Sequence, residues 1–205
     1  MSAAAAGAWR RELEYFFGAV RFFTRLPVPA WVGHSDEALN RATRYFPAVG
    51  LVVGLIAALV FALCSVFWPK TLAVLAAMAA TLYATGAFHE DGWSDMVDGF
   101  GGGWEKAQVL TIMKDSRIGS FGAVALVMML LAKFCTLIEL ELVVIPATLI
   151  AGHTVSRFCS TMVLRTLDYV RDDGKSKPLA TRIGNGELAF AAGTTLFSLL
   201  LVLAL

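Results

Sequence analysis

Apolar residues gather in five long runs along the chain, separated by polar segments of very different length. A helix needs about 20 apolar residues to cross the hydrocarbon core of a bilayer, and runs of this length are too long for the strands of a membrane barrel. The pattern therefore predicts an all-α, multi-pass transmembrane helical bundle with about five spans, in a single integral membrane domain over residues 1–205. The expected spans are Phe46–Phe67, Thr71–Phe88, Phe121–Ile138, Leu142–Leu164 and Leu188–Leu205.

The polar segments alternate between minimal turns and long loops. Residues 68–70 and 139–141 are turns, whereas residues 89–120 and 165–187 are long and polar. Lys70 is the one basic residue outside the expected spans that does not lie on the side of the N-terminus and the long loops. Because cytoplasmic loops carry the excess of Lys and Arg in membrane proteins, the N-terminus and both long loops are expected in the cytoplasm.

Residues 10–26 precede the first expected span and have an amphipathic helical pattern. Arg10, Glu14, Arg21 and Arg25 fall on one stripe of the helix, and aromatic and aliphatic residues lie elsewhere. A basic stripe opposite an apolar face is typical of a helix at the lipid headgroups. The segment is therefore expected to be an interfacial helix, and a membrane anchor is favoured over a substrate-binding role for Arg21 and Arg25.

Composition narrows the functional classes. The chain is 58% hydrophobic and 16% charged, which is too apolar for an ordinary soluble domain. Its net charge of +1 lacks the positive surplus of a nucleic-acid binder, so nucleic acid is not an expected partner. The three cysteines show no spacing of a zinc or haem site.

An acidic cluster follows the second apolar run. If the helix continues past Phe88, then Asp91, Asp95 and Asp98 lie on one face at i, i+4 and i+7. The glycines that follow are stop signals, so the cluster would lie at the C-terminal end of a helix, where the dipole disfavours carboxylates. A cation is therefore expected to offset them.

Hard carboxylate oxygens suit Mg²⁺, held by a few side chains and completed by substrate phosphates. The expected ligands in this chain are Glu90, Asp91, Asp95 and Asp98. The alternative is a solvated acidic loop, which is what most acidic runs are. A metalloprotease motif is excluded because Trp93 stands where a second histidine is needed.

A basic motif comes just before the third apolar run. Lys114, Asp115, Ser116 and Arg117 combine two cations with a hydroxyl, beside glycines that let backbone N–H groups approach a ligand. This combination suits a phosphate or diphosphate. Basic residues at a cytoplasmic helix start are also common topology anchors, and the phosphate interpretation depends on the acidic cluster lying on the same side of the membrane.

Ionisable residues also occur inside the expected spans. His153 and Arg157 are i, i+4 neighbours on the fourth span, where charge is costly. Arg157 either extends toward the headgroups or faces the bundle and a carboxylate–metal–phosphate centre. Lys133, near the far end of the third span, is expected to extend outward.

These motifs resemble a known family, the membrane-bound cobalamin synthases or adenosylcobinamide-GDP ribazoletransferases. The strongest similarity is in His89–Gly102 (HEDGWSDMVDGFGG) and Ile112–Gly122 (IMKDSRIGSFG), and weaker similarity is in Arg21–Pro29 and Tyr45–Gly54. Family members usually continue through further apolar sequence, so this chain is expected to be short at its C-terminus.

The resemblance implies an enzyme of the bacterial cytoplasmic (inner) membrane that uses Mg²⁺. Its substrates would be adenosylcobinamide-GDP and α-ribazole or α-ribazole 5′-phosphate, and its products GMP and adenosylcobalamin or its phosphate. Residues 89–120 would then form a cytoplasmic active-site loop. The resemblance leaves open a homo-oligomer and association with other corrinoid-assembly enzymes.

On this chemistry, Asp91, Asp95 and Asp98 are expected to hold one or two Mg²⁺ ions, with Glu90 as a further ligand or as the base. His89 is either catalytic or a buried hydrogen-bonding residue. The residues assigned to the substrates are Arg25, Lys114, Asp115, Ser116, Arg117, His153 and Arg157.

Two alternatives remain at this stage. A CDP-alcohol phosphotransferase would share the opening Asp95-x-x-Asp98-Gly99, but Gly102 and Gly103 stand where its motif needs Ala-Arg. A transporter would use the intramembrane ionisable residues as an ion pathway. The position of the carboxylates at the expected membrane edge disfavours it.

Overall fold

The computed structural model describes residues 3–170 and 183–203, and within those ranges all regular structure is helical. The all-α prediction is thus confirmed for the described chain. The α-helices are α1 (Ala3–Phe23), α2 (Asp36–Ala42), α3 (Phe46–Phe67), α4 (Lys70–Thr85), α5 (Phe88–Gly102), α6 (Lys106–Ile112), α7 (Ser120–Glu139), α8 (Ile145–Thr166) and α9 (Asn185–Leu203), with a 3-10 turn η1 at Thr43–Tyr45.

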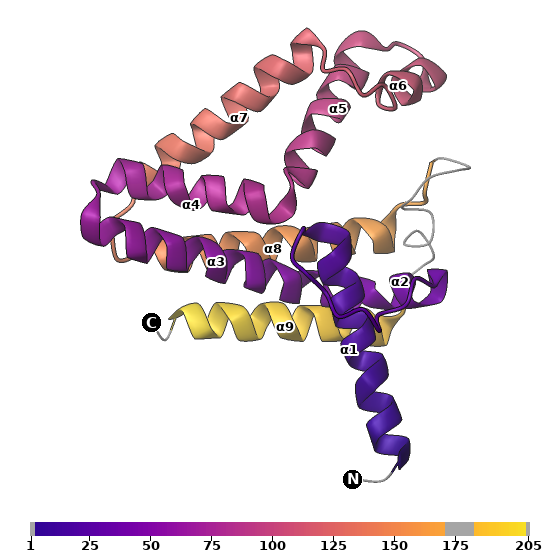
Figure 1. Cartoon of the computed structure of the whole chain (residues 1–205). Coiled ribbons are helices and arrows are strands. Elements are labelled where there is room, and N and C mark those ends of the chain that lie inside the picture. Colours follow the sequence, from indigo (N-terminus) through magenta and orange to yellow (C-terminus); the bar gives the residue numbers. More distant parts are fainter. Residues whose placement is uncertain (1–2, 171–182, 204–205) are drawn as a thin grey trace.

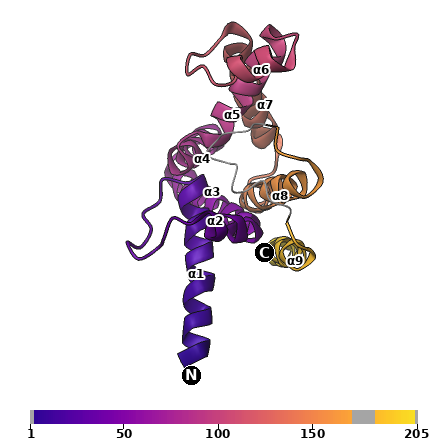
Figure 2. The ribbon, with the colours of Figure 1, turned by 90° about the vertical axis from the view of Figure 1, so that its right-hand side faces the viewer.

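Four helices, α3, α4, α8 and α9, run side by side, and α3 packs most extensively on α8 (Figure 1). A second group, α5, α6 and α7, projects from this layer, while α1 crosses near the start of α3 (Figure 2). The two minimal turns meet at one end of the layer, where Lys70 Nζ donates a hydrogen bond of 3.2 Å to the Leu140 carbonyl. The two short connections thus lie together at one end of the helix layer.

The α3–α8 contact depends on the absence of side chains at two glycines. A Cβ at Gly50 would collide with the carbonyl oxygen of His153, and one at Gly54 would lie 2.7 Å from the Cα of Ile150. Small residues let helix backbones approach this closely, which is a common way for helices to associate in membranes. Gly50 therefore sets the position of the helical turn that carries His153.

The expected second span does not continue through Phe88. α4 ends at Thr85, because Gly86 and Ala87 both adopt left-handed backbone conformations, with φ of 64° and 56°. The chain then turns by 85° into α5. The Arg25 backbone N–H donates to the Ala84 carbonyl at 2.8 Å, and the Arg25 side chain lies against Gly86, where a Cβ would displace it.

This bend corrects the expected electrostatics of the acidic cluster. Glu90 and Asp91 lie in the first turn of α5, and not at the C-terminal end of the preceding helix. The positive end of the helix dipole favours carboxylates there. Asp91, Asp95 and Asp98 nevertheless share one helix, so their i, i+4, i+7 spacing is kept.

The predicted number of spans is not confirmed. In the described residues, three helical segments are long and apolar enough to cross a membrane: residues 36–67, α7 and α9. The bent pair α4 and α5 would add a fourth if it forms one broken span. The remaining expected span coincides with α8, which has the required length but is interrupted by polar side chains, including His153 and Arg157.

The N-terminal segment is helical, but its interfacial position is not confirmed. α1 ends at Phe23, before Leu26, and the Thr24 hydroxyl donates to the Val20 carbonyl while accepting from the Leu26 N–H. Part of its apolar face is already covered by the start of α3. The buried cluster there consists of Ala19, Val20, Phe23, Ala42, Phe46, Val49 and Val53.

We expect Gly50→Ala to destabilise the protein by about 1–3 kcal/mol, because the added methyl group forces α3 and α8 apart. Gly152→Ala on α8 is the matched control, since a Cβ there meets no atom within 4 Å and Ala favours a helix over Gly. Thermal unfolding in detergent micelles checks both. A Gly50→Ala variant as stable as the control would contradict the close-packing argument.

Candidate active site

A pocket of about 410 Å³ lies beside the first turns of α5. One side is formed by Glu90, Asp91, Ser94 and Asp95, and the other by residues 113–118 between α6 and α7. Glu90, Asp91 and Asp95 of the acidic cluster thus line the same pocket as the basic motif, which begins 19 residues after Asp95 in the sequence. The lining residues from the basic motif are Lys114, Asp115, Ser116 and Arg117.

Arg117 is already engaged within the motif. Its Nε lies 3.1 Å from Asp115 Oδ1, and its terminal nitrogen lies 2.7 Å from Oδ2. These hydrogen bonds to the guanidinium favour the carboxylate and lower the pKa of Asp115 to about 2. Because both side chains face solvent, the guanidinium can exchange this partner for a phosphate at little cost.

Asp98 has a different role in the structure from the other three acidic residues. Its Oδ2 accepts the Gly119 N–H at 2.7 Å, and its Oδ1 accepts the Gly122 N–H at 2.8 Å. Its side chain thus supplies acceptors for unpaired N–H groups at the start of α7, as a helix cap does. Asp98 is buried and is not among the residues that line the pocket.

A second polar group lies between α5, α7 and α8. Arg157 is 2% exposed, and its terminal nitrogen lies 3.1 Å from the His153 carbonyl oxygen and 3.2 Å from the His153 Nδ1. The carboxylate of Glu90 interacts electrostatically with both Arg157 and Lys133. Arg157 therefore faces the helix bundle.

Within the described residues, three buried atoms of this group have no hydrogen-bond partner: Nε of Arg157, Nε2 of His89 and Oε2 of Glu90. Buried polar atoms are nearly always paired, so an unpaired one in a native structure needs an explanation. His89 also stacks on Phe23, with ring centroids 5.5 Å apart and 13° between the planes. Both expectations for His89, a catalytic residue and a buried hydrogen-bonding residue, are compatible with this position.

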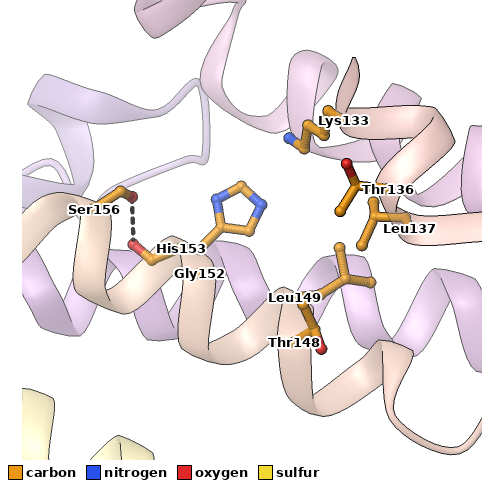
Figure 3. Close-up of a pocket in the computed structure, with 8 residues that line it drawn as sticks. All are labelled: Lys133, Thr136, Leu137, Thr148, Leu149, Gly152, His153 and Ser156. Carbon is orange, nitrogen blue, oxygen red and sulfur yellow. Dashed lines mark hydrogen bonds between the residues drawn. The ribbon is translucent and has the colours of Figure 1, made fainter. Parts of the chain in front are cut away.

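Lys133 does not extend outward as expected. Its side chain is half-buried and lines a second pocket together with His153, between α7 and α8 (Figure 3). The sequence indicated Lys133 as unusual because it is an ionisable residue within an apolar run. The sequence did not show that Lys133 faces α8. Arg25, which was assigned to the substrate, lies at the α4–α5 bend and does not line either pocket.

A family model described as cobalamin-5-phosphate synthase matches residues 15–205. The chain belongs to this family. Curated relatives named adenosylcobinamide-GDP ribazoletransferase include one from Shewanella frigidimarina (strain NCIMB 400), 48% identical over 94% of this chain and 76% of the relative. Another, from Shewanella amazonensis (strain ATCC BAA-1098 / SB2B), is 49% identical over 89% of this chain and 72% of the relative.

No solved structure shows a significant match. The family match favours a ribazoletransferase over the two alternatives, a CDP-alcohol phosphotransferase and a transporter.

The acidic side of the pocket fits a metal shared with substrate better than a closed protein cage. In the described ranges, no three His, Cys, Asp or Glu side chains lie close enough together to hold an ion. Asp91 and Asp95, one helical turn apart, both line the pocket. Mg²⁺ is commonly bound by one or two carboxylates and completed by water and substrate phosphates, and this donor set meets that requirement.

For this cobalamin-5-phosphate synthase family member, we expect Asp98→Asn to lower stability by roughly 1.5–3 kcal/mol, because an amide retains one acceptor for two N–H donors. Asp91→Asn should leave stability nearly unchanged, since Asp91 is exposed. Thermal unfolding in detergent with excess chelator separates capping from metal binding. Equal unfolding temperatures for the two variants would contradict the capping role of Asp98.

Proposed function

We propose that this chain catalyses the ribazoletransferase reaction for which its relatives are named. Adenosylcobinamide-GDP is joined to α-ribazole or its 5′-phosphate, which gives adenosylcobalamin or its 5′-phosphate and releases GMP. The observation that carries the proposal is the α5 pocket, in which Glu90, Asp91 and Asp95 face Lys114 and Arg117. Both halves of this pocket belong to the segments most similar to the family.

The reaction is a displacement at phosphorus. A ribazole hydroxyl attacks the phosphorus on the cobinamide side of the diphosphate, the new P–O bond forms, and the P–O bond to GMP breaks. The hydroxyl loses its proton and GMP carries away the negative charge. Transfers of this kind need positioning and charge neutralisation more than covalent catalysis.

The basic motif is suited to the diphosphate. We assign Lys114 and Arg117 to the charged oxygens and the Ser116 hydroxyl to a hydrogen bond with them. Arg117 would leave Asp115 when the diphosphate enters, because a guanidinium binds a phosphate with the same paired geometry. Asp115 thereby keeps the guanidinium oriented in the empty pocket.

The acidic side is suited to a metal and a base. We propose that Asp91 and Asp95 share Mg²⁺ with the diphosphate, where the ion would neutralise charge on the transferred phosphoryl group. Glu90 is the candidate base, since its buried Oε2 has no hydrogen-bond partner in the part of the chain that the structure describes and can accept a hydrogen bond from a hydroxyl. Asp98 contributes by holding α5 against the start of α7.

We further propose that the chain is placed in the bacterial cytoplasmic membrane with its N-terminus and residues 89–120 and 165–187 in the cytoplasm. The large apolar side chains exposed along α3, α7 and α9 support membrane insertion. Residues 171–182 of the second loop lie outside the described residues. The pocket at α5 would then lie on the cytoplasmic side, where the water-soluble product GMP can be released.

Purified protein in detergent, given both substrates and Mg²⁺, is expected to release GMP, which chromatography quantifies. Omission of α-ribazole phosphate, or excess chelator, should reduce release to background. GMP release that continues without the acceptor would indicate hydrolysis and contradict the transferase proposal.

Asp95→Asn is expected to lower kcat by at least about 100-fold while the protein still inserts and unfolds at the same temperature, because the pocket loses a charged ligand. Glu139→Gln is the matched control, since Glu139 is an exposed carboxylate at the far end of α7. Near-normal turnover of Asp95→Asn would remove this carboxylate from the mechanism.

A further inference from the structure

The pocket between α7 and α8 has no role in the mechanism above. It has a volume of about 390 Å³ and is lined by Lys133 and Thr136 from α7 and by His153 and Ser156 from α8, with Leu137 and Leu149 as an apolar wall (Figure 3). A volume of this size suits a nucleoside or nucleotide and is too small for a corrinoid. Of the two proposed substrates, the acceptor alone is small enough.

The hydrogen-bond donors of the pocket are Lys133 and His153. The Thr136, Thr148 and Ser156 hydroxyls already donate to backbone carbonyls close to them in sequence. The Nδ1 of His153 lies 3.2 Å from the Arg157 guanidinium, which can only donate. A neutral His153 ring therefore carries its proton on Nε2, and this nitrogen is on the side of the ring that faces α7 (Figure 3).

The charges around this pocket do not balance. α7 contributes Lys133, α8 contributes Arg157 and His153, and α5 contributes Glu90 and His89, all of which interact electrostatically. Two cations thus share one carboxylate. A surplus cation held among apolar helices is costly unless an anion joins it, so the group is arranged to receive one.

Glu90 connects this pocket to the diphosphate pocket. It lines the α5 pocket, and its carboxylate interacts with Lys133, which lines the α7–α8 pocket. The candidate base is therefore within electrostatic range of Lys133 in the second pocket.

We propose that the α7–α8 pocket binds the ribazole acceptor, and that Lys133 and His153 bind its 5′-phosphate and select the phosphorylated form. Leu137 and Leu149, the apolar wall, would contact the heterocyclic ring of the acceptor. The 5′-phosphate takes no part in the bond changes, so these two residues act on specificity. The inference rests on the proposed function and adds to it the site and the preferred form of the acceptor.

The test measures kcat/KM for α-ribazole 5′-phosphate and for α-ribazole in the wild type and in Lys133→Met. This substitution keeps most of the length of the side chain and removes its charge. We expect the loss in the variant to be about ten- to a hundred-fold greater on the phosphorylated acceptor than on α-ribazole. Lys133→Arg should keep the preference. Lys70→Met is the control, because Lys70 binds a carbonyl in the turn at the far end of the layer.

An equal loss on both acceptors in Lys133→Met would indicate a purely structural role and overturn the proposal. If Lys133→Met does not fold, His153→Gln replaces it, with the same expected loss of preference for the phosphorylated acceptor. An unchanged preference in His153→Gln would also overturn the proposal.

Direct binding separates this inference from the proposed function. Calorimetric titration of α-ribazole 5′-phosphate into the protein without corrinoid should show binding to the wild type that weakens at least ten-fold in Lys133→Met. If the wild type released no GMP but still bound the phosphate in this Lys133-dependent way, the transfer reaction would fail and the binding site would stand. Equal binding by both proteins would overturn the site.

Discussion

The left-handed break at Gly86 and Ala87 determines where the chemistry can take place. Without the 85° bend, α4 would continue straight and carry the acidic residues away at its C-terminal end. With it, Glu90 and Asp91 lie at the start of a new helix, where the dipole favours them, and face the basic motif. Ala87 lacks the conformational freedom of glycine, so the bend must be held from outside. Arg25, which binds the end of α4, contributes to holding it.

The second constraint is the close packing of α3 on α8. Gly50 lets the two backbones meet at His153, so the position of His153 and Arg157 is set by an apolar interface. Arg157 is almost fully buried yet keeps an unpaired Nε. The packed helix layer thus presents charged groups toward α5 and α7, which carry Glu90 and Lys133.

The three aspartates on one face of α5 have different contacts in the structure. Asp91, Asp95 and Asp98 share a face of α5, but Asp98 caps α7 through two backbone N–H groups while the other two line the pocket. The capping matters to the site, because α7 carries Lys133 and the basic motif directly precedes α7. An alteration of Asp98 would therefore disturb both pockets, although Asp98 is not among the lining residues of either.

The sequence by itself determined that the chain is helical and rich in apolar segments, which turns are short, and that the segments around Asp91 and Lys114 resemble one enzyme family. The helices and turns follow from local composition and spacing, and the resemblance follows from the residues of the two motifs themselves. The tertiary structure alone decided that α4 breaks at Gly86, that α8 is an interrupted apolar helix packed on α3, and that Asp98 binds N–H groups of α7. It also turned Lys133 toward His153. Each of these outcomes depends on contacts between segments distant in the chain, which periodicity and hydropathy do not encode.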